Sequence, residues 1–189
     1  MTRDTTVKQI AAWYRENWGP IQYHTALRAR ASILGDTGIE HAHQFTLLPA
    51  YTAALLNEDP NAMVKLKLVN NRFSSLFIAP SFSRNAWNHV RPFIAVDAAF
   101  TKTMYDYVLL LATAIDANNQ AINLAWGIVP KENTVHWSWF LENLSAMLDG
   151  LNRRGVVIMS DRQKGLNKAI EEVLPLATEG YCCKHIEGN

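Results

Sequence analysis

Two aspartates lie in or directly after apolar stretches that favour β-strands. Asp97 is inside the run IAVDAAF, and Asp161 follows the run VVIMS. A carboxylate among apolar residues is costly to bury unless it is paired or binds a cation. Mg²⁺ and Mn²⁺ prefer oxygen ligands, and a pair of such ions can promote phosphodiester cleavage. Metal-dependent phosphodiester chemistry is therefore one hypothesis for these residues.

A purely structural role is the alternative for each aspartate. Asp97 could be a strand-end acid or a member of a salt bridge. Asp161 precedes a predicted helix that starts at about Gln163, where an aspartate suits the N-cap position. The metal hypothesis requires the two strands to be parallel neighbours, because their backbones then lie about 4.8 Å apart.

Hydrophobic periodicity from Pro92 onward predicts the elements that would position these acids. We expect β-strands over 93–100, 107–115 and 120–129, joined as an antiparallel meander. A helix starting near Thr134, a strand over 156–159, a helix over 163–173 and a strand over 180–184 follow. The order β-β-β-α-β-α-β is that of a ribonuclease H-like mixed α/β sheet, although several α/β folds could use the same elements. Asp161 would end its strand at the carboxyl edge, where open α/β sheets place their sites.

The first 90 residues show a different pattern. Helices are expected over about 7–18 and 23–34 and from Pro49 onward. Alternating apolar residues on either side of Asn70-Asn71 then predict a β-hairpin. We therefore divide the chain into an N-terminal helical region with a β-hairpin, 1–90, and an α/β domain, 91–189.

The overall composition is that of a soluble globular protein. Of the 189 residues 49% are hydrophobic, and 18 basic against 17 acidic residues give a net charge of +1. These values exclude a disordered chain and a polybasic nucleic-acid-binding protein. The most apolar stretch, 107–115, is too short to span a membrane, so no membrane partner is expected. The adjacent Cys182 and Cys183 favour a reducing compartment over a disulfide framework.

Two further groups of residues could bind ligands. Cys182 and His185 form a Cys-x-x-His pair, but a zinc site needs four ligands and no other histidine pair completes one. A buried cysteine, with a histidine that orders an acid or touches DNA, is the favoured reading. Basic residues around Asp161 could bind DNA phosphates, and a solvated helix face explains them about as well. They are Arg153, Arg154, Arg162, Lys164 and Lys168.

From about Arg91 to the last residue, the chain resembles the transposase domain of Mutator-like elements, the MULE domain. The motifs are Asp97 with Phe100 and Lys102, Glu132-Asn133, the Trp-x-Trp-Phe of 137–140, the Ser-Asp-Arg-x-x-Gly-Leu of 160–166, and Cys182-x-x-His185. The segment upstream looks like the region that precedes this domain in the same proteins. Nearly the whole chain is therefore covered by the resemblance.

The resemblance implies a DDE-type transposase of the ribonuclease H-like fold, which cuts and rejoins DNA at transposon ends with Mg²⁺ or Mn²⁺. It makes Asp97 and Asp161 the first two catalytic and metal-binding acids, in a nuclear protein that could form homo-oligomers. The expected nucleic-acid-binding residues are Arg162, Lys164, Lys168 and His185. The expected structural motif residues are Cys182, His185, Trp137 and Phe140, whereas Trp139 could face a partner.

Two features depart from the family pattern. The usual Asp-Gly-Thr-Phe is replaced by Asp97-Ala98-Ala99-Phe100. The third acid, a Glu beyond the Cys-x-x-His motif, is absent, and no other acid of the chain matches its motif. We therefore expect this chain alone to lack full activity, and expect an apolar surface that missing helices would cover. The alternatives are a non-catalytic relic that binds DNA or protein, and a ribonuclease acting on RNA–DNA hybrids.

Overall fold

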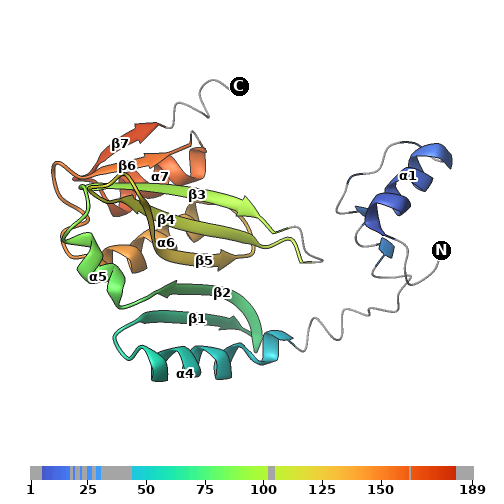
Figure 1. Ribbon diagram of the computed structural model, residues 1–189, viewed down its shortest axis with the longest axis horizontal. Coiled ribbons are helices and arrows are strands. Elements are labelled where there is room, and N and C mark those ends of the chain that lie inside the picture. Colours follow the sequence, from blue (N-terminus) through green and yellow to red (C-terminus); the bar gives the residue numbers. More distant parts are fainter. Residues whose placement is uncertain are drawn as a thin grey trace.

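A seven-stranded mixed sheet dominates the computed structural model, which describes residues 6–17, 19, 22, 25–26, 29–30, 44–101, 105–161 and 163–181 (Figure 1). The strand order is β1-β2-β5-β4-β3-β6-β7. The strands are β1 (Met63–Val69), β2 (Arg72–Ala79), β3 (Phe93–Phe100), β4 (Val108–Ile115), β5 (Ala121–Val129), β6 (Val157–Ser160) and β7 (Thr178–Tyr181). The helices are α1 (Val7–Asn17), α4 (Leu48–Glu58), α5 (Phe82–Trp87), α6 (Thr134–Met147) and α7 (Lys164–Val173).

The centre of the sheet has the connectivity predicted from the sequence. Strands β3, β4 and β5 form an antiparallel meander. Strand β6 then returns beside β3 and pairs with it in parallel, and β7 pairs in parallel with β6. The expectation that the two aspartate-bearing strands are parallel neighbours is thereby confirmed.

Helices α6 and α7 cover one face of this sheet and form the core with it. Alternate residues of β4 point toward them and are fully buried, whereas the residues between are only partly buried. This alternation is the mark of a strand with two different faces. The helices contribute large buried side chains to this core, including Trp137, Phe140, Leu141, Leu144 and Ile170.

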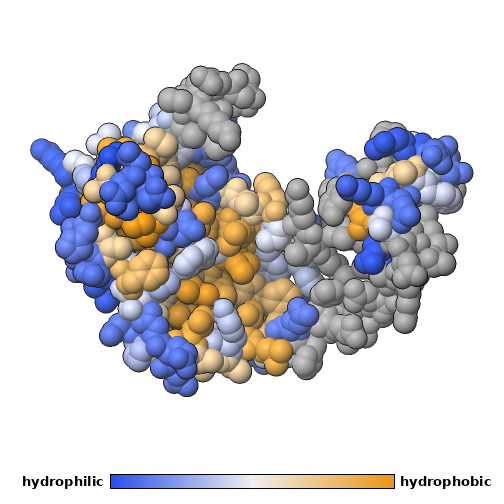
Figure 2. Space-filling model, viewed as in Figure 1, coloured by the Kyte–Doolittle hydropathy of each residue, from blue (hydrophilic) through white to orange (hydrophobic). Residues whose placement is uncertain are grey.

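The opposite face of the meander is apolar and only half-buried. Leu109 and Leu111 of β4 and Trp126 and Ile128 of β5 lie on it. Figure 2 shows hydrophobic side chains gathered over the strands in this view. The expectation of an exposed apolar surface stays a prediction, because these side chains are half-buried rather than exposed.

The predicted hairpin is present and extends the sheet. Asn70 and Asn71, both with positive φ (51° and 58°), form the two-residue turn between β1 and β2, which is the backbone of a type I′ turn. Strand β2 pairs with β5, so the hairpin and the meander share one sheet. Helix α4 begins at Leu48 with Pro49 in its first turn, close to the predicted start.

Some elements differ from the sequence expectations. Helix α5 was not expected; it is held by Trp87, whose Nε1 donates to the Asp149 carbonyl at 3.0 Å, and by Ser83, whose Oγ donates to the Leu124 carbonyl at 2.7 Å. Strand β7 begins at Thr178 rather than Gly180. Most of the helix expected over 23–34 lies outside the described residues. Among the described helices, none is long and apolar enough to cross a membrane.

Candidate functional site

Asp97 and Asp161 stand at matching positions on neighbouring strands. Ala95 of β3 is in register with Met159 of β6, and each aspartate lies two residues beyond this pair. Parallel strands lie about 4.8 Å apart, so the two carboxylates emerge side by side. Both stand toward the carboxyl ends of their strands, where β6 leads into α7.

Asp97 is exposed rather than buried within its apolar run. One of its oxygens, Oδ1, accepts a hydrogen bond from the backbone N–H of Ala98 at 2.9 Å. In the described part of the chain, no Lys, Arg or His side chain lies within ion-pair distance of Asp97, so the salt-bridge alternative is not observed there. The carboxylate therefore faces solvent with its second oxygen available.

Asp161 does not cap helix α7. The N-cap is Gln163, whose Oε1 accepts from the Leu166 N–H at 2.6 Å. Asp161 is half-buried, and its Oδ1 accepts instead from the backbone N–H of Gln163 at 3.0 Å. The alternative in which Asp161 caps this helix is not observed, because the Gln163 side chain accepts from the first turn instead. Asp161 is thus fixed in place beside the helix start.

A third carboxylate, Glu132, interacts electrostatically with both aspartates. It stands in the loop between β5 and α6, and its Oε1 accepts from Nε1 of the buried Trp137 at 3.3 Å. Burial raises the pKa of the Glu132 carboxyl, and the charges of Asp161 and Asp97 raise it further, whereas the Trp137 hydrogen bond lowers it. Sequence reasoning found Glu132 only as a motif residue; the coupling depends on the folded loop.

The start of α6 packs directly on the start of α7. Asn133 caps α6 by accepting from the His136 N–H at 3.0 Å. Gly165 faces this turn: a Cβ at Gly165 would lie 2.9 Å from the backbone nitrogen of Thr134 and 3.2 Å from the carbonyl carbon of Asn133. The Gly of the Ser-Asp-Arg-x-x-Gly-Leu motif therefore allows the close approach of the starts of α6 and α7, which follow Glu132 and Asp161 in the chain.

Substituting this glycine is expected to separate the two helices. Because backbone atoms cannot move aside as side chains do, Gly165→Ala should lower the free energy of unfolding by about 1–3 kcal/mol, despite the better helix propensity of alanine. Urea titration followed by circular dichroism measures this loss. The exposed Lys168→Ala on the same helix is the control and should change stability by less than about 0.5 kcal/mol. Unchanged or greater stability of Gly165→Ala would contradict the prediction.

The basic residues are not all at the same place. Lys164 is the first residue of α7 and is exposed. It follows the end of β6, as Asp161 does. Lys168 is exposed and lies 3.7 Å from Glu172, in a surface ion pair. Arg153 and Arg154 precede β6 and so lie at its opposite end from Asp161. Arg162 lies outside the described residues.

The aromatic motif on α6 belongs to the core. Trp137 and Phe140 are fully buried, and their rings meet edge to face at 5.8 Å. Trp139 is half-buried and its ring lies 6.4 Å from that of Phe77, so it packs against the core rather than facing solvent freely. Cys182 and His185 lie outside the described residues.

The arrangement offers two adjacent carboxylates rather than a closed metal cage. In the described ranges, no group of three or more His, Cys, Asp or Glu side chains is close enough to hold an ion. Two carboxylates are nevertheless the protein donor set with which Mg²⁺ is often bound when substrate phosphates supply the remaining oxygens. The residues present therefore fit such an ion at an open edge of the sheet.

Comparison with known proteins identifies relatives of this chain. The MULE transposase domain model matches residues 93–189, just over half of the chain. The transposase for insertion sequence element IS905 of Lactococcus lactis is 31% identical over 83 residues, covering 42% of this chain and 19% of the relative. Protein FAR1-RELATED SEQUENCE 6 of Arabidopsis thaliana is 23% identical over 112 residues, which cover 59% of this chain and 16% of the relative. The chain thus spans a fifth or less of the length of these curated relatives, and it belongs to the MULE transposase domain family.

Proposed function

We propose that this domain cleaves and rejoins DNA phosphodiester bonds with divalent cations held by Asp97 and Asp161. The parallel register of β3 and β6 is the observation that supports this most directly, because it puts both acids at one sheet edge. DNA, at the ends of a transposable element, is the proposed substrate, and the nucleus is the compartment in which we propose that the protein acts.

The chain's own groups suit the binding of Mg²⁺ or Mn²⁺. Asp97 and Asp161 each use Oδ1 for a backbone N–H. These bonds orient the carboxylates and leave Oδ2 of each to face an ion. When bound, such ions lower the energy of the attacking and leaving oxygens in phosphodiester cleavage.

The strand order supports a ribonuclease H-like sheet for the domain. The order β5-β4-β3-β6-β7, an antiparallel meander followed by two parallel strands, leaves β3 central between β4 and β6. Asp97 on the central strand can then be approached by DNA along the sheet edge. Exposed Lys164, three residues after Asp161, is the described cation best placed to contact a phosphate there.

Iron-directed cleavage tests where the ion binds. Fe²⁺ substitutes for Mg²⁺ and, with ascorbate and peroxide, cuts the polypeptide next to its site. We expect cuts around Asp97 and after β6, suppressed by excess Mg²⁺. Because no acid of the chain matches the motif of the third catalytic acid, we expect only residual nicking of supercoiled plasmid, which requires Mg²⁺ or Mn²⁺ and stops with EDTA. Cuts confined to other segments, or nicking that persists without a divalent ion, would contradict the proposal.

A further inference from the structure

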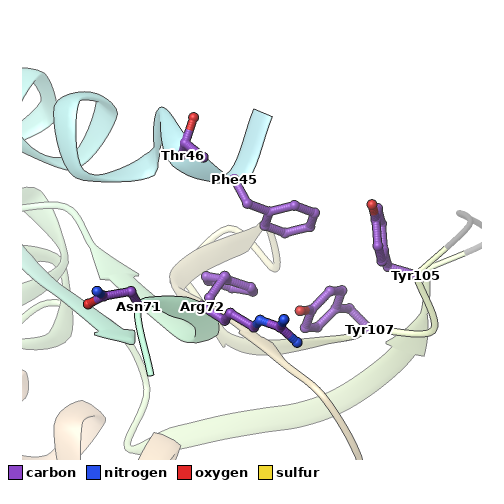
Figure 3. Close-up of a pocket in the computed structure, with 7 residues that line it drawn as sticks. Phe45, Thr46, Asn71, Arg72, Tyr105 and Tyr107 are labelled. Atoms are coloured by element: carbon purple, nitrogen blue, oxygen red, sulfur yellow. The ribbon is translucent and has the colours of Figure 1, made fainter. Parts of the chain in front are cut away.

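A pocket of about 460 Å³ lies where three segments distant in sequence meet (Figure 3). The first segment contains Phe45 and precedes α4, the second runs from the hairpin turn into β2, and the third precedes β4. The volume is within the range of pockets that hold small ligands. The lining residues are Phe45, Thr46, Asn71, Arg72, Phe73, Tyr105 and Tyr107.

Four of the lining side chains are aromatic and contact one another. The ring of Phe45 stacks on Phe73 at 5.2 Å and meets Tyr105 edge to face at 5.1 Å. The centre of the Tyr107 ring lies 5.2 Å from the ring centre of Phe73 and 5.6 Å from that of Phe45. In Figure 3, Phe45 lies on one side of the pocket and Tyr107 on the other. Such rings offer flat faces to a planar, unsaturated ligand.

One of the residues that line this aromatic pocket is an arginine. Arg72 is exposed, and it has no acidic ion-pair partner among the residues that the structure describes. Figure 3 shows its guanidinium extending toward the ring of Tyr107. An arginine beside aromatic rings suits a ligand that combines a planar ring with a negative charge, as a nucleotide does.

The pocket lies at the same end of the strands as the two aspartates. Asp97 pairs with Leu111 of β4, and Tyr107 lies four residues before Leu111. The Thr101 N–H donates to the Tyr107 carbonyl at 2.9 Å, which continues the pairing past the ends of the two strands. From the usual spacings along and between strands, the backbones at Asp97 and Tyr107 are roughly 14 Å apart. This distance is about the length of four stacked nucleotides.

We propose that the pocket binds an unpaired nucleobase of a DNA strand whose backbone reaches the Asp97–Asp161 edge. The base stacks on the rings of Phe45, Tyr105 and Tyr107, and Arg72 contacts the adjoining phosphate. The inference rests on the proposed function, because it takes DNA as the ligand. Aromatic grooves also bind proline-rich peptides. The positive charge of Arg72, which has no acidic partner among the described residues, and the nearby acids favour a nucleotide.

Oligonucleotide binding by the full chain tests the pocket. The probes are a fluorescein-labelled single-stranded DNA of about 12 nucleotides, a size typical of stacking sites, and its duplex. We expect Tyr107→Leu to weaken single-strand binding about 5- to 100-fold, with a smaller effect on the duplex. Tyr107→Phe, which keeps the ring, should bind as the parent chain does.

The exposed arginine gives a second variant that does not depend on the packing of the rings. Arg72→Gln should reduce the slope of log affinity against log salt concentration by about 0.7, the value for one phosphate contact on a single strand. The control, Arg154→Gln, changes an exposed arginine at the far end of β6 and should leave the slope unchanged.

Photocrosslinking locates the base directly. An oligonucleotide with one 5-iodouracil should crosslink to Phe45, Tyr105 or Tyr107, in Asp97→Ala as well as in the parent chain. The proposal would be overturned by crosslinks confined to other segments, or by equal affinity of Tyr107→Leu and the parent chain for single-stranded DNA. It would also be overturned if the pocket bound a proline-rich peptide but not DNA. These failures differ from a failure of the proposed function, which would abolish iron cleavage at the aspartates while leaving the crosslink in place.

Discussion

Asp161→Asn is expected to abolish metal-dependent nicking of DNA and iron-directed cleavage at the end of β6. Asparagine retains the oxygen that accepts the Gln163 N–H, so the backbone around residue 161 keeps its shape. The substitution removes the negative charge and one of the two hard oxygen donors that we assign to the ion. Loss of outer ligand-supporting groups typically costs 10- to 100-fold in metal affinity or activity, and we expect the loss of a direct ligand to exceed about 100-fold.

The matched control for this variant is another acid on the neighbouring helix. Glu171 lies on the exposed side of α7, away from the strand end, so Glu171→Gln should retain both nicking and iron cleavage. Asp97→Asn should behave as Asp161→Asn does, because the register places both acids at the same edge. Retention of Mg²⁺-dependent nicking in either aspartate variant would remove that residue from the proposed site.

The strand pattern made much of the sheet predictable. Strand β4 alternates strictly between buried and half-buried residues, and Asn70-Asn71 favours a two-residue hairpin turn. Helix α5 was missed because it is only six residues long and is held by contacts to β5 and to the segment after α6. Short helices of this kind depend on tertiary contacts, which the hydrophobic periodicity of the local sequence does not reveal.

The candidate site was predictable in part. The pair Asp97 and Asp161 follows from strand order, which the sequence predicted. The position of Glu132 beside them does not, because it depends on the close contact between the starts of α6 and α7 at Gly165. The aromatic pocket was missed for the same reason: Phe45 and Tyr107 are far apart in sequence, and neither belongs to a local motif.

Trp137→Ala is expected to cause the largest loss of stability, because the indole is fully buried beneath the candidate site. Its removal leaves a cavity beside Phe140 and leaves Glu132 without the indole N–H donor. Truncating a buried tryptophan costs about 3–5 kcal/mol, much of the 5–15 kcal/mol that stabilises a typical domain. Urea unfolding monitored by circular dichroism measures the change. Trp13→Ala, in which the replaced ring is 46% exposed, is the control and should cost less than about 1 kcal/mol.

A second substitution at Trp137 separates packing from hydrogen bonding. Trp137→Phe keeps an aromatic ring in the core but removes the Nε1–H that donates to Glu132. Because this hydrogen bond lowers the pKa of the Glu132 carboxyl, its loss should raise that pKa further, and carboxyl ¹³C NMR titration measures the shift. A large pKa rise with a smaller stability loss than in Trp137→Ala would show that one core residue both stabilises the sheet and sets the charge next to Asp97 and Asp161. An unchanged pKa in Trp137→Phe would leave Trp137 as a packing residue alone.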